Sequence, residues 1–116
     1  MNNVLNLTIV EGNLTKDPEL LYTKSGNSVC KFDIAVNSNF KQKDSEYHEV
    51  SFISVNVWNK LAEVCATYLK KGAFVRIKGK LKQQSWIGKE GVKKQKVVII
   101  AETVDFLGSR IKNKVA

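Results

Sequence analysis

The sequence predicts an all-β fold: a five-stranded antiparallel barrel with one helix between strands three and four and a long hairpin joining strands four and five. Apolar and polar residues alternate along five segments, which is typical of strands with one buried face. Residues 59–72 have apolar residues at helical spacing instead. Two glycines separate the last two alternating segments, as a hairpin tip requires. We expect residues 1–108 to form one domain with one core and residues 109–116 to form a short, basic, flexible end.

The first strand is expected at residues 4–11, "VLNLTIVE", and one of its faces carries Leu5, Leu7 and Ile9. Val4 and Val10 lie on the opposite face, so the strand is apolar on both sides. A lone small barrel cannot cover both faces of its first strand. The pattern therefore predicts a homo-oligomer.

A second strand is expected at residues 29–36, and a polar loop follows at residues 37–48. Loops of that length without structure of their own are usually functional or disordered. Phe40 lies in this segment, close to Lys41 and Lys43. An aromatic ring beside cations makes the loop a candidate binding segment.

The third strand, "VSFISVNVW" at residues 50–58, has an unusual outer face. Its inward face is apolar, whereas its outer face combines polar residues with two large aromatics, Phe52 and Trp58. Exposed aromatics of this kind indicate contact with another molecule. The alternatives are cover by another subunit for Phe52 and packing at the end of the helix for Trp58.

Residues 59–72, "NKLAEVCATYLKKG", predict the one helix, with Asn59 as N-cap and Gly72 as the residue that ends it. Its buried stripe is expected to hold Leu61, Val64, Cys65, Tyr68 and Leu69. The predicted core contains Leu5, Ile9, Phe32, Ile34, Val55, Leu61 and Val75.

The fourth strand, residues 73–86, has an apolar face and a cationic face. Phe74 and Trp86 stand at the two ends of the cationic face, and the cations between them are Arg76, Lys78, Lys80 and Lys82. A hairpin tip at residues 87–94 leads to the fifth strand at residues 95–106. This order of elements is the connectivity of the OB-fold, which binds oligonucleotides on one sheet face.

The net charge of +8 is concentrated in one part of the chain. Residues 70–96 hold ten basic residues and one acid, Glu90, which gives +9. The other 89 residues hold nine basic and ten acidic residues, which gives −1. Such a distribution is typical of a surface that binds a polyanion. A charge run that only solubilises the chain is the alternative.

Aromatic residues among cations match the two features of a single-stranded nucleic acid, its exposed bases and its charged backbone. Phe40, Phe52, Trp58 and Trp86 are the candidates for stacking on bases. Phe74 directly follows the helix and is expected in the core instead. These features do not distinguish DNA from RNA.

Little in the sequence points to catalysis, a cofactor or a metal. His48 is the only histidine, and there is no paired-carboxylate motif, phosphate-binding glycine loop or metal-ligand spacing. Cys30 and Cys65 are expected to be small buried residues of a protein from reducing cytoplasm. No apolar run is long enough to span a membrane, and the N-terminus lacks the basic region of a signal peptide.

Three segments resemble the bacterial single-stranded DNA-binding protein (SSB) family. "GNLTKDPEL", from Gly12 onward, resembles its opening strand-and-turn motif, and "KLAEVCATYLKKG", from Lys60 onward, resembles its helix. The strand that ends at Trp86 resembles the first half of its long hairpin. The likeness extends over residues 3–108.

The resemblance implies a non-enzymatic homotetramer of OB-folds in the cytoplasm, associated with the nucleoid. It implies sequence-nonspecific binding of single-stranded DNA in replication, recombination and repair. The bases would stack on Phe40, Phe52, Trp58 and Trp86. Basic residues of the family lie near the DNA path at positions that correspond here to Lys41, Lys43, Lys60, Lys71 and Lys82.

The chain also departs from the family pattern. Ile53 stands where many members have His, and Leu21 and Ser54 stand where some have Arg. The family usually continues into a flexible tail whose acidic tip recruits replication and repair proteins, whereas the last residues here, "RIKNKVA", are basic. That tail was either removed or is naturally absent, so these partners stay open. The alternative functions are a tail-less primosomal replication-restart protein of the same fold and an accessory nucleic-acid-binding domain that acts with an enzyme.

Overall fold

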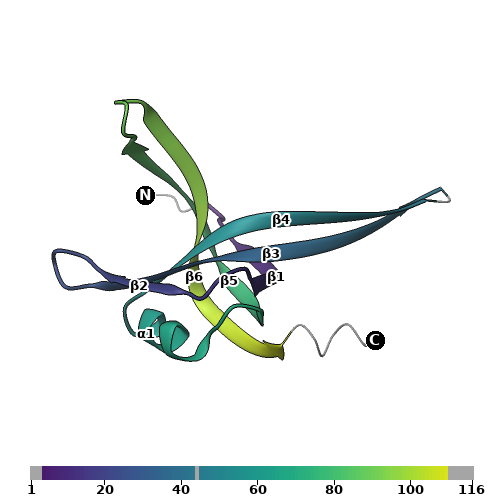
Figure 1. Ribbon diagram of the computed structural model, residues 1–116, viewed down its shortest axis with the longest axis horizontal. Helices are drawn as coiled ribbons and strands as arrows, with labels where there is room; N and C mark the ends of the chain where they lie inside the picture. The colour runs from purple at the N-terminus through teal and green to yellow at the C-terminus, as the bar shows by residue number, and fades with distance from the viewer. Residues whose placement is uncertain (1–3, 44, 110–116) are drawn as a thin grey trace.

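The computed structural model describes residues 4–43 and 45–109 (Figure 1). The elements in chain order are β1 (Thr8–Leu14), β2 (Glu19–Tyr22), β3 (Ser28–Gln42), β4 (Ser45–Trp58), α1 (Asn59–Tyr68), β5 (Ala73–Ile87) and β6 (Lys93–Ser109). The strands pair in the order β1-β5-β6-β4-β3, and β1 also pairs with β3, so these five strands close a barrel. The predicted fold class is therefore confirmed. β4 and β6 pair in parallel, which the description as an antiparallel barrel did not include.

Two hairpins extend from the barrel as arms in different directions (Figure 1). The β3–β4 arm is paired from Val29 opposite Trp58 to Gln42 opposite Ser45. The prediction of a polar loop at residues 37–48 is thus wrong, because β3 continues to Gln42 and β4 begins at Ser45. The polar sequence suggested a loop because both faces of this arm lie outside the barrel, and neither face has to be apolar.

The first strand begins later than predicted, and the residues expected to face inward face outward instead. β1 runs from Thr8 to Leu14, and Leu5 and Ile9 are 90% and 57% exposed, so their assignment to the core is wrong. The inward positions are Val10, Gly12 and Leu14 instead. A side chain at Gly12 would clash with the backbone carbonyl of Ala35, so glycine allows β1 and β3 to approach closely.

The helix is shorter than predicted and has a different buried face. It ends at Tyr68, and Gly72 lies farther on, in the turn before β5, with a φ of 91°. Trp58, not Asn59, occupies the N-cap position, and no side chain caps the helix. Val64 and Tyr68 are exposed, so they are not part of the buried stripe. Ala62 and Cys65 are the buried residues of α1.

The core fills the barrel and the space between the barrel and α1. The fully or almost fully buried members are Leu14, Cys30, Phe32, Ile34, Val55, Val57, Ala62, Cys65, Leu69, Val75, Ile77, Ile99 and Ala101. Burial raises the pKa of the Cys30 thiol to about 11, and burial together with the neighbouring Cys30 raises that of Cys65 to about 12. Both cysteines are free and buried, as predicted.

β2 is a short strand that the pattern did not predict. It pairs with the beginning of β3, from Glu19 opposite Lys31 to Tyr22 opposite Ser28. Its four residues, "ELLY", are too few to show an alternating pattern.

Candidate nucleic-acid interface

The outer faces of β4, β6 and β5 form one continuous surface, because these strands are neighbours in the sheet. Residues paired across two strands lie on the same face. Asn56 of β4 pairs with Ile100 of β6, and Ile100 pairs with Lys80 of β5. This register brings the aromatic outer face of β4 next to the cationic outer face of β5.

A groove on this surface brings together three residues that the sequence singled out. Trp58, Lys80 and Lys82 line it, together with Asn6, Leu81 and Ile100. Trp58 is 37% exposed, so its indole is accessible to a ligand. Its backbone is extended at the junction of β4 and α1, which keeps the side chain on the outer face of β4 instead of turning it into the helix.

Asn6 fixes one wall of the groove. Its side-chain Nδ2 donates a hydrogen bond to the carbonyl oxygen of Leu81, and its Oδ1 accepts one from the Leu81 amide, both at 2.9 Å. The amide side chain thus takes the place of a paired strand beside β5. Leu81 lies between Lys80 and Lys82, so these bonds also hold the backbone that carries both cations.

Phe52 lies on the same outer face of β4 and is 71% exposed. Its partner across the β3–β4 pair is Ala35, which is too small to cover the ring. The next residue on this face, Ser54, donates a hydrogen bond of 2.8 Å to Asp33. The ring of Phe52 therefore stands free on a polar surface, which suits a stacking contact.

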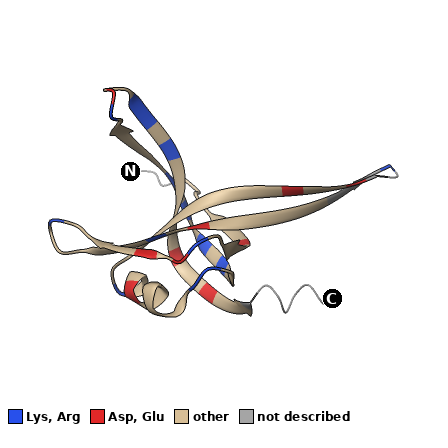
Figure 2. Cartoon of the chain, viewed as in Figure 1, with Lys and Arg blue, Asp and Glu red and all other residues tan. Residues whose placement is uncertain are grey.

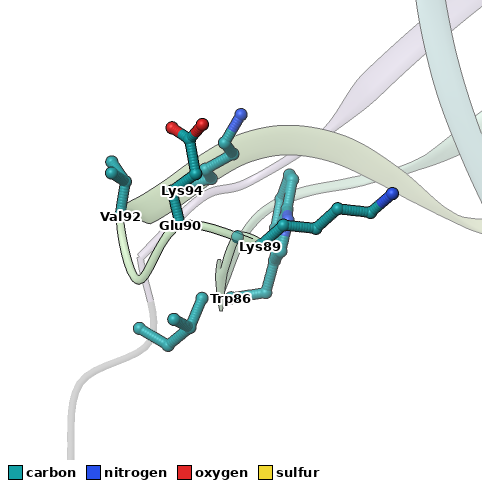
Figure 3. Close-up of a pocket in the computed structure, with 7 residues that line it drawn as sticks. Trp86, Lys89, Glu90, Val92 and Lys94 are labelled. Atoms are coloured by element: carbon teal, nitrogen blue, oxygen red, sulfur yellow. The ribbon is translucent and has the colours of Figure 1, made fainter.

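Trp86 is the residue before the last in β5, near the tip of the β5–β6 arm. Basic residues gather on this arm (Figure 2). Trp86 is 45% exposed and pairs with Lys94 across the arm. Trp86, Lys89 and Lys94 line an open pocket together with Ile87, Gly88, Glu90 and Val92 (Figure 3). The tip is held by a hydrogen bond of 2.8 Å from the Gly88 amide to the Val92 carbonyl oxygen.

Four cations of this arm were not among the predicted site residues: Lys89, Lys93, Lys94 and Lys96. Lys94 is opposite Trp86, Lys96 is opposite Gln84, and Lys89 belongs to the tip. Lys94 and Lys96 therefore share the outer face of β5 that carries Lys80 and Lys82. The signal in the sequence was the +9 segment, but only the register of the hairpin shows which of its cations share a face with Trp86.

Other predicted site residues are not among those that line the groove. Lys43 is in the turn of the β3–β4 arm. Lys71 is in the turn after α1, where its backbone amide donates a hydrogen bond of 2.8 Å to Asp17. Lys60 follows Trp58 by two residues, at the start of α1, and is exposed.

Arg76 and Lys78 lie on the outer face of β5, in the half that pairs with β1. Arg76 forms an ion pair of 2.6 Å with Glu11 of β1. The side chains of Phe40 and Lys41 and the whole C-terminal end from residue 110 lie outside the described part of the chain. Phe74 is half-buried but belongs neither to the core nor to the residues packed against it, so its predicted place in the core is wrong.

Within residues 4–43 and 45–109, no group of three or more His, Cys, Asp or Glu residues is arranged to hold a metal ion. No helix in these residues has the length and apolar character needed to cross a membrane. His48 is exposed on the β3–β4 arm.

Residues 5–107 match the family described as the single-strand binding protein family. A single-stranded DNA-binding protein of Wolinella succinogenes is 42% identical over 106 residues, which cover 90% of this chain and 65% of that protein. One from Treponema pallidum is 39% identical over 105 residues, which cover 90% of this chain and 59% of that protein. The chain thus spans 59–65% of the length of these two relatives.

The fold is also similar to a solved structure, that of a Plasmodium falciparum SSB in complex with ssDNA. The two superpose with a TM-score of 0.84 at 23% sequence identity, and the match covers 92% of this chain and 99% of the other. At this identity the likeness supports the fold, and it agrees with the closed barrel and single helix described above.

Proposed function

We propose that this chain, which belongs to the single-strand binding protein family, binds single-stranded DNA without sequence preference. The observation that carries this proposal is the groove in which Trp58 lies beside Lys80 and Lys82. Every base offers a flat face to an aromatic ring, and every nucleotide offers a phosphate to a cation. Neither contact depends on which base is present, so the arrangement favours general binding over sequence-specific binding.

The proposed path of the DNA follows the continuous outer face. It passes Phe52 on β4, crosses the groove at Trp58, and continues along the β5–β6 arm to Trp86. Lys94 and Lys96 would contact phosphates along the arm, together with Lys80 and Lys82. The Phe40 hairpin and the remaining predicted lysines belong to the proposal as flanking contacts, supported by the sequence alone.

We also propose that the chain assembles with copies of itself. Leu5, Leu7 and Ile9 are 90%, 52% and 57% exposed in the single chain. Exposed apolar residues this close together are typical of a protein interface. The expected number of subunits is four, by resemblance to the family. A monomeric mass in light scattering at micromolar concentration would contradict this part of the proposal.

The proposed biological role is to hold and protect single strands during replication, recombination and repair, in the cytoplasm at the nucleoid. The proposed contacts stack on bases and neutralise phosphates, and none of them makes or breaks a covalent bond. The proposal therefore includes no catalysis and no cofactor. Recruitment of replication and repair proteins is an expectation for the family's acidic tail and is not assigned to these residues.

The test is a titration of the protein with oligo-dT and with a duplex of the same length at the same salt concentration. We expect tight binding of oligo-dT and far weaker binding of the duplex, because paired bases do not offer their faces. Fluorescence of Trp58 and Trp86 should be quenched as bases stack on the indoles. Equal affinity for the two ligands, or binding without quenching, would refute the proposed mode.

A further inference from the structure

The cationic row on the outer face of β5 has two electrostatically different halves. Lys80 and Lys82 face Ile100 and Val98 across the β5–β6 pair, and neither partner is charged. Lys78 pairs with Ile9 on one side and with Thr103 on the other, which are also uncharged. Lys80 and Lys82 therefore have no carboxylate opposite them on β6. The exposed Glu102 lies in the irregularity of β6 between Thr103 and Ala101, next to Lys78.

Arg76 is in a different environment. Its Nε and Nη2 both donate to Oε2 of Glu11, at 2.7 Å and 2.6 Å. On its other side it pairs in register with Asp105 of β6. Residues directly opposite in a sheet have Cβ atoms only about 4.5–5.5 Å apart. Arg76 therefore stands between two carboxylates, and the row Glu11, Arg76 and Asp105 has a net charge of −1.

We propose that this row is the boundary of the DNA track: the path includes Lys80 and Lys82 and ends before Arg76. A phosphate approaching Arg76 would have to displace Glu11 from the guanidinium and would be repelled by two carboxylates. A phosphate approaching Lys80 meets neither obstacle. The boundary leads the strand from the β5–β6 arm toward Trp58 and β4, and away from β1. The alternation predicted Arg76 as a DNA contact. In this proposal it does not contact DNA, because it is paired with Glu11 at the boundary.

This inference rests on the proposed function, and matched substitutions on one strand face test it. Arg76→Gln and Lys80→Gln each remove one positive charge from the outer face of β5, four residues apart. For a single strand, each neutralised phosphate contributes about 0.7 to the slope of log affinity against log salt concentration. We expect Lys80→Gln to flatten the slope by about 0.7 and Arg76→Gln to leave it unchanged.

The reciprocal variant, Glu11→Gln with Asp105→Asn, keeps Arg76 and removes its two carboxylates. The freed guanidinium should then bind a phosphate, so the slope should steepen by about 0.7. This variant decides the question even if Arg76→Gln fails to fold. Equal flattening by Arg76→Gln and Lys80→Gln, or an unchanged slope in the double variant, would overturn the boundary. Failure of the unmodified protein to bind oligo-dT would instead refute the proposed function itself.

Discussion

Replacing Phe52 with alanine should weaken binding of single-stranded DNA and leave the fold intact. The ring is 71% exposed and faces only Ala35 across the sheet, so its removal opens no cavity in the core. Substitutions at such surface positions usually change the free energy of unfolding by no more than about 0.5 kcal/mol. The loss of one stacking contact costs about 1–3 kcal/mol of binding free energy. This corresponds to an increase in Kd of about 5- to 150-fold.

Tyr68 offers a matched control. It is also aromatic and is 69% exposed, but it lies on α1 and not on the proposed track. Tyr68→Ala should therefore leave both affinity and stability unchanged. Titration with oligo-dT measures the affinities through quenching of Trp58 and Trp86, which both variants retain, and urea unfolding measures the stabilities.

The comparison of the two variants can refute the stacking argument in a specific way. If Phe52→Ala and Tyr68→Ala had the same effect on affinity, exposure of an aromatic ring on β4 would not mark the DNA track. If Phe52→Ala changed only the oligomer mass, the ring would be covered by another subunit, which is the alternative that the sequence left open. Phe52→Trp, which enlarges the ring, should strengthen binding if stacking is correct.

Three further predictions concern charge, packing and the thiols. Lys94→Gln with Lys96→Gln should flatten the salt slope by about 1.4, and a slope equal to that of the unmodified protein would remove the β5–β6 arm from the track. Gly79→Ala should destabilise the fold by about 1–3 kcal/mol in urea unfolding, because the added Cβ meets the backbone carbonyl of Ile100; an unchanged midpoint would contradict this close approach. Cys30 and Cys65 should resist a thiol reagent until the protein unfolds. Because burial raises their pKa values from 9.0 to about 11 and about 12, unfolding should also become easier as pH rises above about 9, and a stability that is constant from pH 8 to 11 would refute this.

The sequence predicted the closed barrel because its strands alternate where one face is buried. Phe32, Ile34, Val55 and Val75 lie in the core as expected. The prediction failed where this rule does not hold. Leu5 is apolar but 90% exposed, so an apolar residue in an alternating pattern does not by itself mark a core position.

The β3–β4 arm shows the opposite failure. Its outer part, residues 37–42 and 45–48, is mostly polar, yet it forms regularly paired strands. Hydrogen bonds between the two backbones specify this hairpin, and they leave no trace in the polarity of the side chains. Side-chain periodicity alone therefore could not distinguish the arm from a loop.

The candidate site shows which parts of an interface a sequence can specify. Alternation assigned Phe52 and Trp58 to the outer face of β4, and Lys80 and Lys82 to the outer face of β5. It could not show that these two faces adjoin, because that depends on the parallel pairing of β4 with β6, two strands far apart in the chain. It also could not show that Arg76 is held by Glu11, which requires the register of β1 against β5.

The two faces of these strands explain why binding and stability should respond to different substitutions. Along β5, Val75 and Ile77 are fully buried on one face, while Lys80 and Lys82 are exposed on the other. Changing a lysine alters the charge of the track and leaves the core contacts in place. Gly79, the neighbour of Lys80 in the chain, is the exception, because it lies on the buried face. The pairing of β5 with β6 shifts by one residue there, and the backbone of β5 closely approaches that of Ile100. A side chain there would push apart the strands that place Lys80 and Lys82 beside Trp58, so both stability and affinity should fall together.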